Sequence, residues 1–223
     1  GDVYKRQIYI IVIYKRDIAM SKSVNLYVVV PCYNEEAVLH ETSKQMLELF
    51  GEMKNDGLIN DNSRIVFVDD GSKDKTWSII DELTKAHTEI SGIKLAKNAG
   101  HQNALFGGLM TVKDNCDCAI SIDADLQDDI HVIPDMVRNF IDGYDVVYGV
   151  RNKRDTDTFF KRTTAVGFYK LMQFMGVNIV FNHADYRLMS KRALDGLAQF
   201  PERNLFLRGM VPLVGYRSTN VYY

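Results

Sequence analysis

The sequence predicts a single α/β domain with a mostly parallel sheet flanked by helices, and three observations favour this class. Of the 223 residues, 46% are hydrophobic and 25% are charged, which suffices for one sizeable core. Short runs rich in Val and Ile alternate with longer stretches whose apolar residues recur at helical spacing. No internal repeat, low-complexity segment or Pro/Gly-rich linker interrupts the alternation. Such alternation is typical of parallel strands joined by right-handed crossovers.

Five apolar runs are expected to form strands, because each is short and rich in β-branched residues. They cover residues 26–30, 64–68, 93–95, 118–122 and 145–148. Pro31 directly follows the first run and is expected to end that strand.

Helices are expected between these strands. Leu39, Met46 and Phe50 mark one face of a helix over 35–54. A second helix is expected after Asp74, whose carboxylate can cap it. Further helices are expected over 101–113, 131–141, 159–175 and 191–198.

Residues 1–19 are predicted to lie outside this domain, as an upstream or non-native extension. The run 8–14 is strongly apolar, but seven residues are too few to span a bilayer. Met20 resembles a natural start, and the strand pattern begins shortly after it. A short extra edge strand is the alternative. We therefore expect the domain to occupy residues 20–223.

Charge and cysteine usage limit the possible functions. A formal net charge of -2 provides no global basic surface, so nucleic acid is not an expected partner. The three cysteines, Cys32, Cys116 and Cys118, are odd in number and show no Cys-x-x-Cys or Cys/His ligand spacing, which favours a reducing, cytoplasmic environment.

Three of the expected strands end in unusual polar groups, namely PCYNEE, VDDGSKDKT and SIDADLQD. In open α/β sheets, ligands bind where the carboxyl ends of the strands meet. Asp123 and Asp125 would place two hard oxygen ligands on a rigid element, which suits a divalent cation bridging a diphosphate. The alternative is that such aspartates only cap turns. Asp69 and Asp70 on a second strand end favour a ligand site, because clustered carboxylates repel one another unless they are compensated.

In this order, the three motifs resemble the inverting family 2 glycosyltransferases, whose GT-A fold has a Rossmann-like sheet. DADLQD with the downstream ADYRLM (184–189) resembles the polyprenyl-phosphate sugar transferases, including dolichol-phosphate mannose synthases and bactoprenol glucosyltransferases. The resemblance implies metal-dependent, inverting transfer of a hexose from a nucleotide-diphosphate sugar to a polyprenyl phosphate at the cytoplasmic face of the cell membrane. UDP-glucose is the first choice of donor.

The resemblance also implies roles for individual residues. The nucleotide-sugar would contact Pro31, Tyr33, Glu35, Asp69, Asp70 and Asp123. A Mg²⁺ or Mn²⁺ ion would be held by Asp125 and Gln127. The acceptor phosphate would be bound by Arg151, Arg187, Arg203 and Arg208. The catalytic residues would be Asp185, which faces the anomeric carbon, together with Asp123 and Arg208.

Two of these assignments depend on physical arguments. A phosphate monoester is mostly ionised at neutral pH, so Asp185 is expected mainly to orient substrates, with base action secondary. His101 invites a catalytic role, but a histidine at a helix start is more often a cap or a packing residue, and we predict that role. The apolar stretch 205–214 around Arg208 fits either core packing or contact with lipid headgroups.

Other functions are less well supported. A sugar nucleotidyltransferase would normally carry a Gly-rich, Arg-containing phosphate loop where this chain has PCYNEE. Processive polysaccharide synthases carry a Gln-x-x-Arg-Trp signature, whereas the single tryptophan here is Trp77. A non-catalytic nucleotide-sugar-binding module remains an alternative. Transfer to a saccharide or other soluble acceptor is the main alternative, and it would need Asp185 as general base.

The bactoprenol-type relatives usually continue into membrane helices, but this sequence has no stretch of about 20 apolar residues. We expect a catalytic domain truncated before such helices, although a peripherally attached, soluble-domain member is the alternative. The sequence leaves open which sugar, which nucleotide and which oligomeric state apply.

Overall fold

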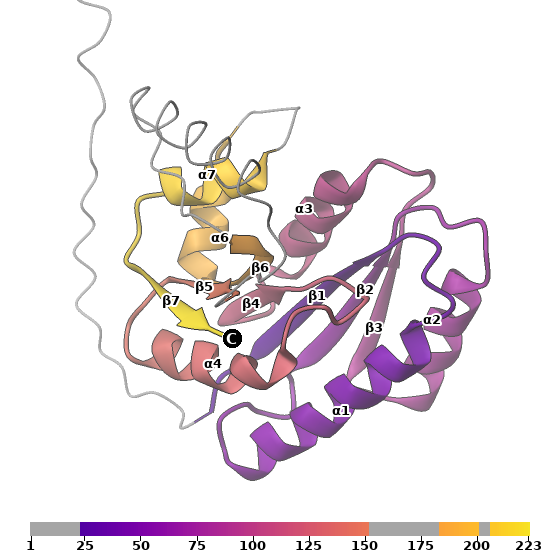
Figure 1. The fold of residues 1–223 in the computed structure, drawn as a ribbon, viewed down its shortest axis with the longest axis horizontal. Helices are drawn as coiled ribbons and strands as arrows, with labels where there is room; N and C mark the ends of the chain where they lie inside the picture. The colour runs from indigo at the N-terminus through magenta and orange to yellow at the C-terminus, as the bar shows by residue number, and fades with distance from the viewer. Residues whose placement is uncertain (1–22, 152–182, 201–205) are drawn as a thin grey trace, which may run out of the picture.

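The computed structural model describes residues 23–151, 183–200 and 206–223. In this part of the chain, seven strands form one sheet in the order β3-β2-β1-β4-β6-β5-β7 (Figure 1). The strands are β1 (Leu26–Cys32), β2 (Arg64–Asp69), β3 (Ile90–Lys94), β4 (Cys118–Ser121), β5 (Val146–Val150), β6 (His183–Ser190) and β7 (Ser218–Tyr222). β6 runs antiparallel to both of its neighbours, and the other strand pairs are parallel. The predicted α/β class and mostly parallel sheet are confirmed.

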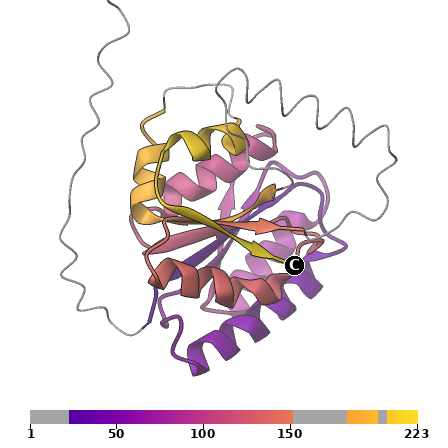
Figure 2. The same cartoon turned by 60° about the vertical axis from the view of Figure 1, so that its left-hand side comes forward.

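Helices cover both faces of the sheet, as Figures 1 and 2 show. α1 (Leu39–Asn55), α2 (Thr76–Ala86) and α4 (Ile133–Ile141) contribute to one apolar core. α3 (His101–Val112), α6 (Lys191–Leu197) and α7 (Leu207–Leu213) contribute to the other. A short 3-10 helix, Ile130–Val132, precedes α4.

The central strands are buried on both faces, which explains their continuous apolar runs. Val28 and Val30 of β1 belong to the core beneath α1, whereas Val29 belongs to the core beneath α3. Successive side chains of a strand point to opposite faces, so β1 contributes to both cores. This strand is therefore a rigid base for the polar residues that follow it.

The antiparallel direction of β6 determines which of its residues reach the carboxyl ends of β1 and β4. In the β4–β6 ladder, Ser121 pairs with Arg187. Because the two strands run in opposite directions, Asp185 lies two residues beyond this pair, toward the end of β4 that leads to Asp123. A residue far along the chain thus reaches the predicted site.

Several predictions on elements need correction. β1 continues through Pro31, which pairs with Val68 in the ladder, because the fixed φ of proline is compatible with extended backbone. β6, β7 and α7 were not predicted. The helix expected after Asp74 is present as α2, but its N-cap is Lys75 and no side chain caps it; the Asp74 carboxylate accepts the Thr76 N–H at 2.9 Å in the turn just before the helix. The predicted extension 1–19 and the helix over 159–175 lie outside the described residues.

Within the described ranges, no helix combines the length and the apolar character that crossing a bilayer requires.

Candidate active site

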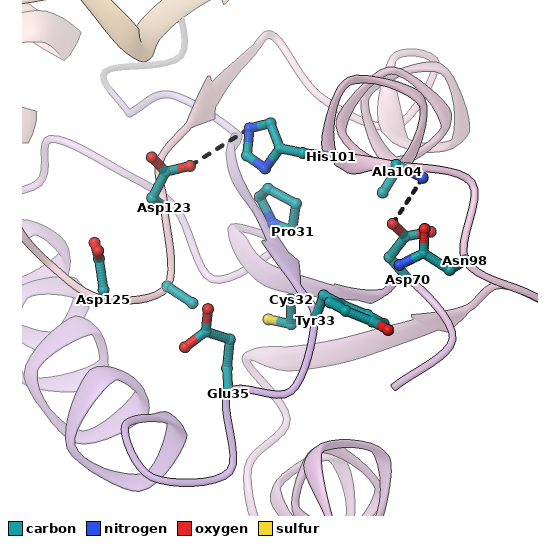
Figure 3. A pocket seen from close by; sticks show the side chains of 12 residues that line it. Pro31, Cys32, Tyr33, Glu35, Asp70, Asn98, His101, Ala104, Asp123 and Asp125 are labelled. Carbon is teal, nitrogen blue, oxygen red and sulfur yellow. Dashed lines mark hydrogen bonds and ion pairs between the residues drawn. The ribbon is translucent and has the colours of Figure 1, made fainter. Parts of the chain in front are cut away.

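A pocket of about 300 Å³ opens where β1, β2 and β4 end (Figure 3). It is lined by Pro31, Cys32, Tyr33, Glu35, Asp70, Asn98, Gly100, His101, Ala104, Asp123, Ala124 and Asp125. In Figure 3, the carboxylates of Glu35, Asp123 and Asp125 lie along one side, and Asp70 lies on the other. The pocket thus unites residues from all three motifs.

The turn after β1 is tied to the turn after β2. The Asn34 N–H donates to Ser72 Oγ at 2.9 Å, and Asn34 Oδ1 accepts the Lys73 N–H at 2.8 Å. Asn34 has a positive φ of 57°, a conformation that asparagine tolerates better than most residues. This link places the predicted nucleotide residues Pro31, Tyr33 and Glu35 on the pocket wall.

The two aspartates after β2 have different surroundings. Both oxygens of Asp70 accept backbone N–H groups, from Ala99 at 2.6 Å and from Gly100 at 2.9 Å. Asp70 therefore lines the pocket but also holds the turn before α3. Asp69 is buried; its Oδ1 accepts the Ser72 N–H at 3.1 Å, whereas its Oδ2 has no hydrogen-bond partner in the described part of the chain. Asp69 does not line the pocket as Asp70 does, so a ligand would meet this unpaired oxygen only behind the pocket wall.

The loop after β4 supplies the acidic side of the pocket. Burial, followed by the charges of Asp125 and Asp123, raises the pKa of Glu35. Burial also raises the pKa of Asp123, and the charges of Asp185 and other nearby carboxylates add to this shift against the opposing effect of His101. Like charges that destabilise one another in this way fit a bound cation.

Of the two residues predicted to hold that cation, only Asp125 lines the pocket. Asp125 is exposed, and its Oδ1 accepts the Gln127 N–H at 3.1 Å. The side chain of Gln127 is not part of the pocket wall. Among the described residues, no three His, Cys, Asp or Glu side chains are arranged to hold a metal. An ion here would need further ligands, such as phosphate oxygens and water.

Asp185 lies beside the pocket, where hydrogen-bond donors surround its carboxylate. Arg187 donates to Oδ1, and the Gln102 amide donates to Oδ2 at 2.9 Å. Arg208 Nη2 lies 3.7 Å from Oδ2. Burial alone would raise the pKa of Asp185, but the adjacent His101 ring and the charges of the two arginines hold it well below its usual range. Asp185 is thus an ionised, weakly basic carboxylate.

His101 joins the two sides of the site. Its Nε2 lies 3.6 Å from Asp123 Oδ1 and 3.7 Å from Asp185 Oδ2, and Figure 3 shows the ring turned toward Asp123. The close approach of the Asp185 carboxylate and the charges of the nearby carboxylates raise the pKa of His101 against the effect of burial. The N-cap of α3 is Gly100 and no side chain caps this helix, so of the predicted cap or packing role for His101 the cap alternative is wrong.

The predicted acceptor arginines are not equivalent. Arg187 is only 1% exposed and donates to Asp185 and to the Leu207 carbonyl, so its guanidinium is not placed to bind a phosphate as predicted. Arg151 donates to Asp128 Oδ1 through Nε at 2.9 Å and Nη2 at 2.6 Å. Arg208 has 41% of its side chain exposed. Arg203 lies outside the described residues.

Three further residues at the site were not predicted. Gln102 contacts Asp185, and its position within the turn that begins α3 was the only sequence signal for it. Asp128 is buried and accepts hydrogen bonds from Arg151 and from the Tyr223 hydroxyl. Its place in DADLQD could have indicated a role, whereas nothing in the sequence indicated Tyr223.

Residues 27–197 match the family model described as glycosyl transferase family 2. The chain belongs to glycosyltransferase family 2. This match confirms the resemblance found in the three motifs, and the matched range contains the residues of the acid-lined pocket and Asp185.

Similar proteins agree with this family. The uncharacterized glycosyltransferase YkoT of Bacillus subtilis is 54% identical over 198 residues, covering 89% of this chain and 59% of that protein. The bactoprenol glucosyl transferase of Shigella phage SfV is 39% identical over 196 residues, covering 87% of this chain and 61% of that protein. The family 2 chain thus spans about three fifths of the length of these curated relatives.

A solved structure supports the GT-A fold of this family 2 domain. The mannosyltransferase PcManGT from Pyrobaculum calidifontis, in complex with GDP-Man and Mn²⁺, superposes with a TM-score of 0.61. The identity is 19%, and the match covers 90% of this chain and 55% of that chain.

Proposed function

We propose that the protein transfers a hexose from a nucleotide-diphosphate sugar, with UDP-glucose as first choice, to a polyprenyl phosphate, with inversion at the anomeric carbon. The observation that carries this proposal is the position of Asp185 between the pocket and Arg208. Its Oδ2 lies 3.7 Å from His101, which lines the acidic pocket, and 3.7 Å from the partly exposed Arg208. The 39% identity to a bactoprenol glucosyl transferase supports the choice of sugar and acceptor.

The nucleotide would occupy the side of the pocket formed by Pro31, Tyr33 and Asp70. The unpartnered Oδ2 of Asp69 would accept a hydrogen bond from a base N–H or a ribose hydroxyl. Asp123, on the opposite side, would lie near the donor sugar.

A divalent cation fits the acidic side of the pocket, where Asp125 and Gln127 would hold Mg²⁺ or Mn²⁺ together with diphosphate oxygens. Such an ion offsets the charge that develops on a departing nucleoside diphosphate. The Mn²⁺ bound with GDP-Man in the mannosyltransferase of similar fold supports this assignment. Asp125 is exposed at the rim, so its carboxylate is accessible to an ion that arrives with the nucleotide.

The acceptor would bind on the Arg208 side of Asp185. A phosphate oxygen of the acceptor would form a bond to the anomeric carbon while the bond from that carbon to the nucleoside diphosphate breaks. The acceptor arrives already ionised, so Asp185 would orient it and the sugar rather than remove a proton. Arg151 and Arg203 remain proposed contributors, and the reaction would take place at the cytoplasmic face of the cell membrane.

A donor screen tests the proposal. The full-length protein in detergent would be mixed with Mn²⁺, a short polyprenyl phosphate and each of several UDP- and GDP-sugars, and nucleoside diphosphate release would be followed. We expect release with UDP-glucose that depends on both the lipid phosphate and the metal. Release with a saccharide but not with the lipid phosphate would favour the other acceptor class. No release with any donor would overturn the enzyme assignment.

A further inference from the structure

Gln102, the second residue of α3, links Asp185 to the start of α7. Its Nε2 donates to Asp185 Oδ2 at 2.9 Å, and its Oε1 accepts the Leu207 N–H at 3.2 Å. Arg187 makes a parallel connection, because it donates to Asp185 Oδ1 and, at 3.3 Å, to the Leu207 carbonyl. Asp185, Gln102, Leu207 and Arg187 therefore close a hydrogen-bonded ring, the Asp185 ring.

The chemistry of its neighbours determines which way the Gln102 amide points. An ionised Asp185 only accepts hydrogen bonds, and the Leu207 N–H only donates one. The Gln102 amide carries a donor NH₂ group and an acceptor oxygen. The flipped amide would place its oxygen against the Asp185 carboxylate and its NH₂ group against the Leu207 N–H, so neither hydrogen bond could form. A side chain that connects two such different groups is poorly replaced by one with only a donor or only an acceptor.

The Asp185 ring also explains why the charged Arg187 side chain is buried, although its burial is unfavourable. Arg187 is 1% exposed, and its Nε has no hydrogen-bond partner in the described part of the chain. Leaving a buried polar atom unpaired is unfavourable, so a position that retains one requires a compensating role. Holding both Asp185 and Leu207 provides that role.

We propose that Gln102 is a positioning residue for the acceptor side of the reaction. Leu207 begins α7, so its N–H has no partner within that helix, and Gln102 supplies one. The next residue, Arg208, is thereby set 3.7 Å from Asp185. The inference rests on the proposed function, since it assumes that Arg208 meets the acceptor phosphate.

The same geometry predicts that substitution of Gln102 affects the acceptor side of the site and not the binding of the donor. His101 and Gly100, the neighbours of Gln102 on the donor side, line the pocket, whereas the Gln102 side chain is not part of the pocket wall. Its substitution should therefore alter the position of Arg208 and leave the binding of the nucleotide-sugar unchanged.

The first experiment measures hydrogen exchange at the Leu207 amide in the full-length protein. Gln102→Leu removes both hydrogen bonds, and Gln102→Asn is one methylene too short to make both. We expect exchange at Leu207 to accelerate by about tenfold or more in both variants. Asn103→Ala is the matched control, because that neighbouring residue is exposed and its amide, among the described residues, donates only to the nearby Ala99 carbonyl at 2.7 Å. Unchanged exchange in Gln102→Leu would overturn the inference.

The second experiment measures transfer to a short polyprenyl phosphate. We expect kcat/KM for the acceptor to fall about tenfold or more in Gln102→Leu, while the Kd of the nucleotide-sugar stays within about twofold. Equal losses for donor and acceptor, or activity equal to that of Asn103→Ala, would overturn the positioning role. A wild-type protein without transfer would instead overturn the proposed function, and the exchange result would then decide whether the Asp185 ring exists.

Gln102→Glu provides a third test, the pH dependence of transfer relative to wild type, which should not change if Gln102 has a merely structural role. The introduced group has the same size, but once ionised it repels Asp185; once protonated it can donate to Asp185 and accept from Leu207. The charged groups around this position are Asp185 and Arg187 on β6, His101 on α3, Asp123 after β4 and Arg208 on α7. Transfer relative to wild type should rise as the pH falls from about 8 to about 5.5. A constant ratio would contradict the inference.

Discussion

Arg187 and Asp185, two residues apart on β6, form a buried ion pair behind the candidate active site. Side chains two positions apart on a strand point to the same face, so the strand itself brings the two charges together. The Arg187 guanidinium donates to Asp185 Oδ1, whereas Asp185 Oδ2 accepts from Gln102 and faces the pocket side. The orientation of Asp185 is therefore determined from within the sheet.

The first prediction concerns the stability of this pair. Arg187→Met keeps the length of the aliphatic stem but leaves the Asp185 carboxylate buried with less compensation. We expect the free energy of unfolding to fall by about 3–5 kcal/mol, because removal of one partner leaves an uncompensated buried charge. Urea denaturation followed by circular dichroism measures the change.

Arg138→Ala is the control for that experiment. Arg138 pairs with Asp135 at 2.7 Å on α4, and more than half of each side chain is exposed. Its loss should cost at most about 1 kcal/mol, as for surface ion pairs. A cost for Arg187→Met no greater than this would show that the buried pair does not support the fold.

The donor side of the site could be predicted because its signals are local in the sequence. Val68 is followed at once by Asp69, and Ile122 by Asp123, so the apolar run and the polar group appear together. The carboxyl ends of parallel strands meet at one edge, which places these groups near each other without further information.

The acceptor side could not be predicted in the same way. Asp185 and Arg187 interrupt the apolar pattern of β6 and compensate each other only after folding, so neither strand propensity nor periodicity identifies the strand. Likewise, the local sequence around His101 indicates only a histidine at a helix start, where such a residue is often a cap. The packing of α3 against β1 and β4 places its ring between two carboxylates, and the local sequence does not contain that information.

The second prediction concerns the protonation of His101. The close Asp185 carboxylate and the charges of the other nearby carboxylates raise its pKa, so we expect a titration midpoint above the value of about 6.5 typical of histidine. Asp185→Asn should lower the midpoint. Imidazole NMR signals, assigned through their loss in His101→Gln and recorded without donor or added metal, measure both values.

The raised pKa also predicts how stability depends on pH. Because His101 binds its proton more tightly in the folded state, its stabilising contribution is complete below the unfolded-state pKa and is lost as the pH rises through the folded-state pKa. The difference in unfolding free energy between wild type and His101→Gln should therefore shrink as the pH increases. A difference that grows with pH would contradict the assignment.

The third prediction concerns the proposed metal ligand. Asp125→Ala should abolish metal-dependent transfer and weaken Mn²⁺ binding measured by electron paramagnetic resonance in the presence of nucleoside diphosphate. Since Asp125 is exposed, the free energy of unfolding should change by only about 0.5 kcal/mol. Asp142→Ala is the control, because Asp142 is an exposed aspartate at the C-cap of α4 and does not line the pocket. Transfer retained by Asp125→Ala would exclude Asp125 as an essential ligand.

The last prediction separates the two roles considered for Asp185. A general base contributes about 10²- to 10⁴-fold to a rate, and it needs a pKa near the working pH. The arginines and His101 hold the pKa of Asp185 far below that range, and an ionised phosphate acceptor has no proton that must be removed. Asp185→Asn should therefore lower kcat for a polyprenyl phosphate by less than about tenfold from pH 6 to pH 9, because the amide still occupies the position from which the carboxylate orients the substrates. Loss of all turnover, with donor binding and circular dichroism unchanged, would instead establish the carboxylate as the base and favour an acceptor whose hydroxyl must be deprotonated.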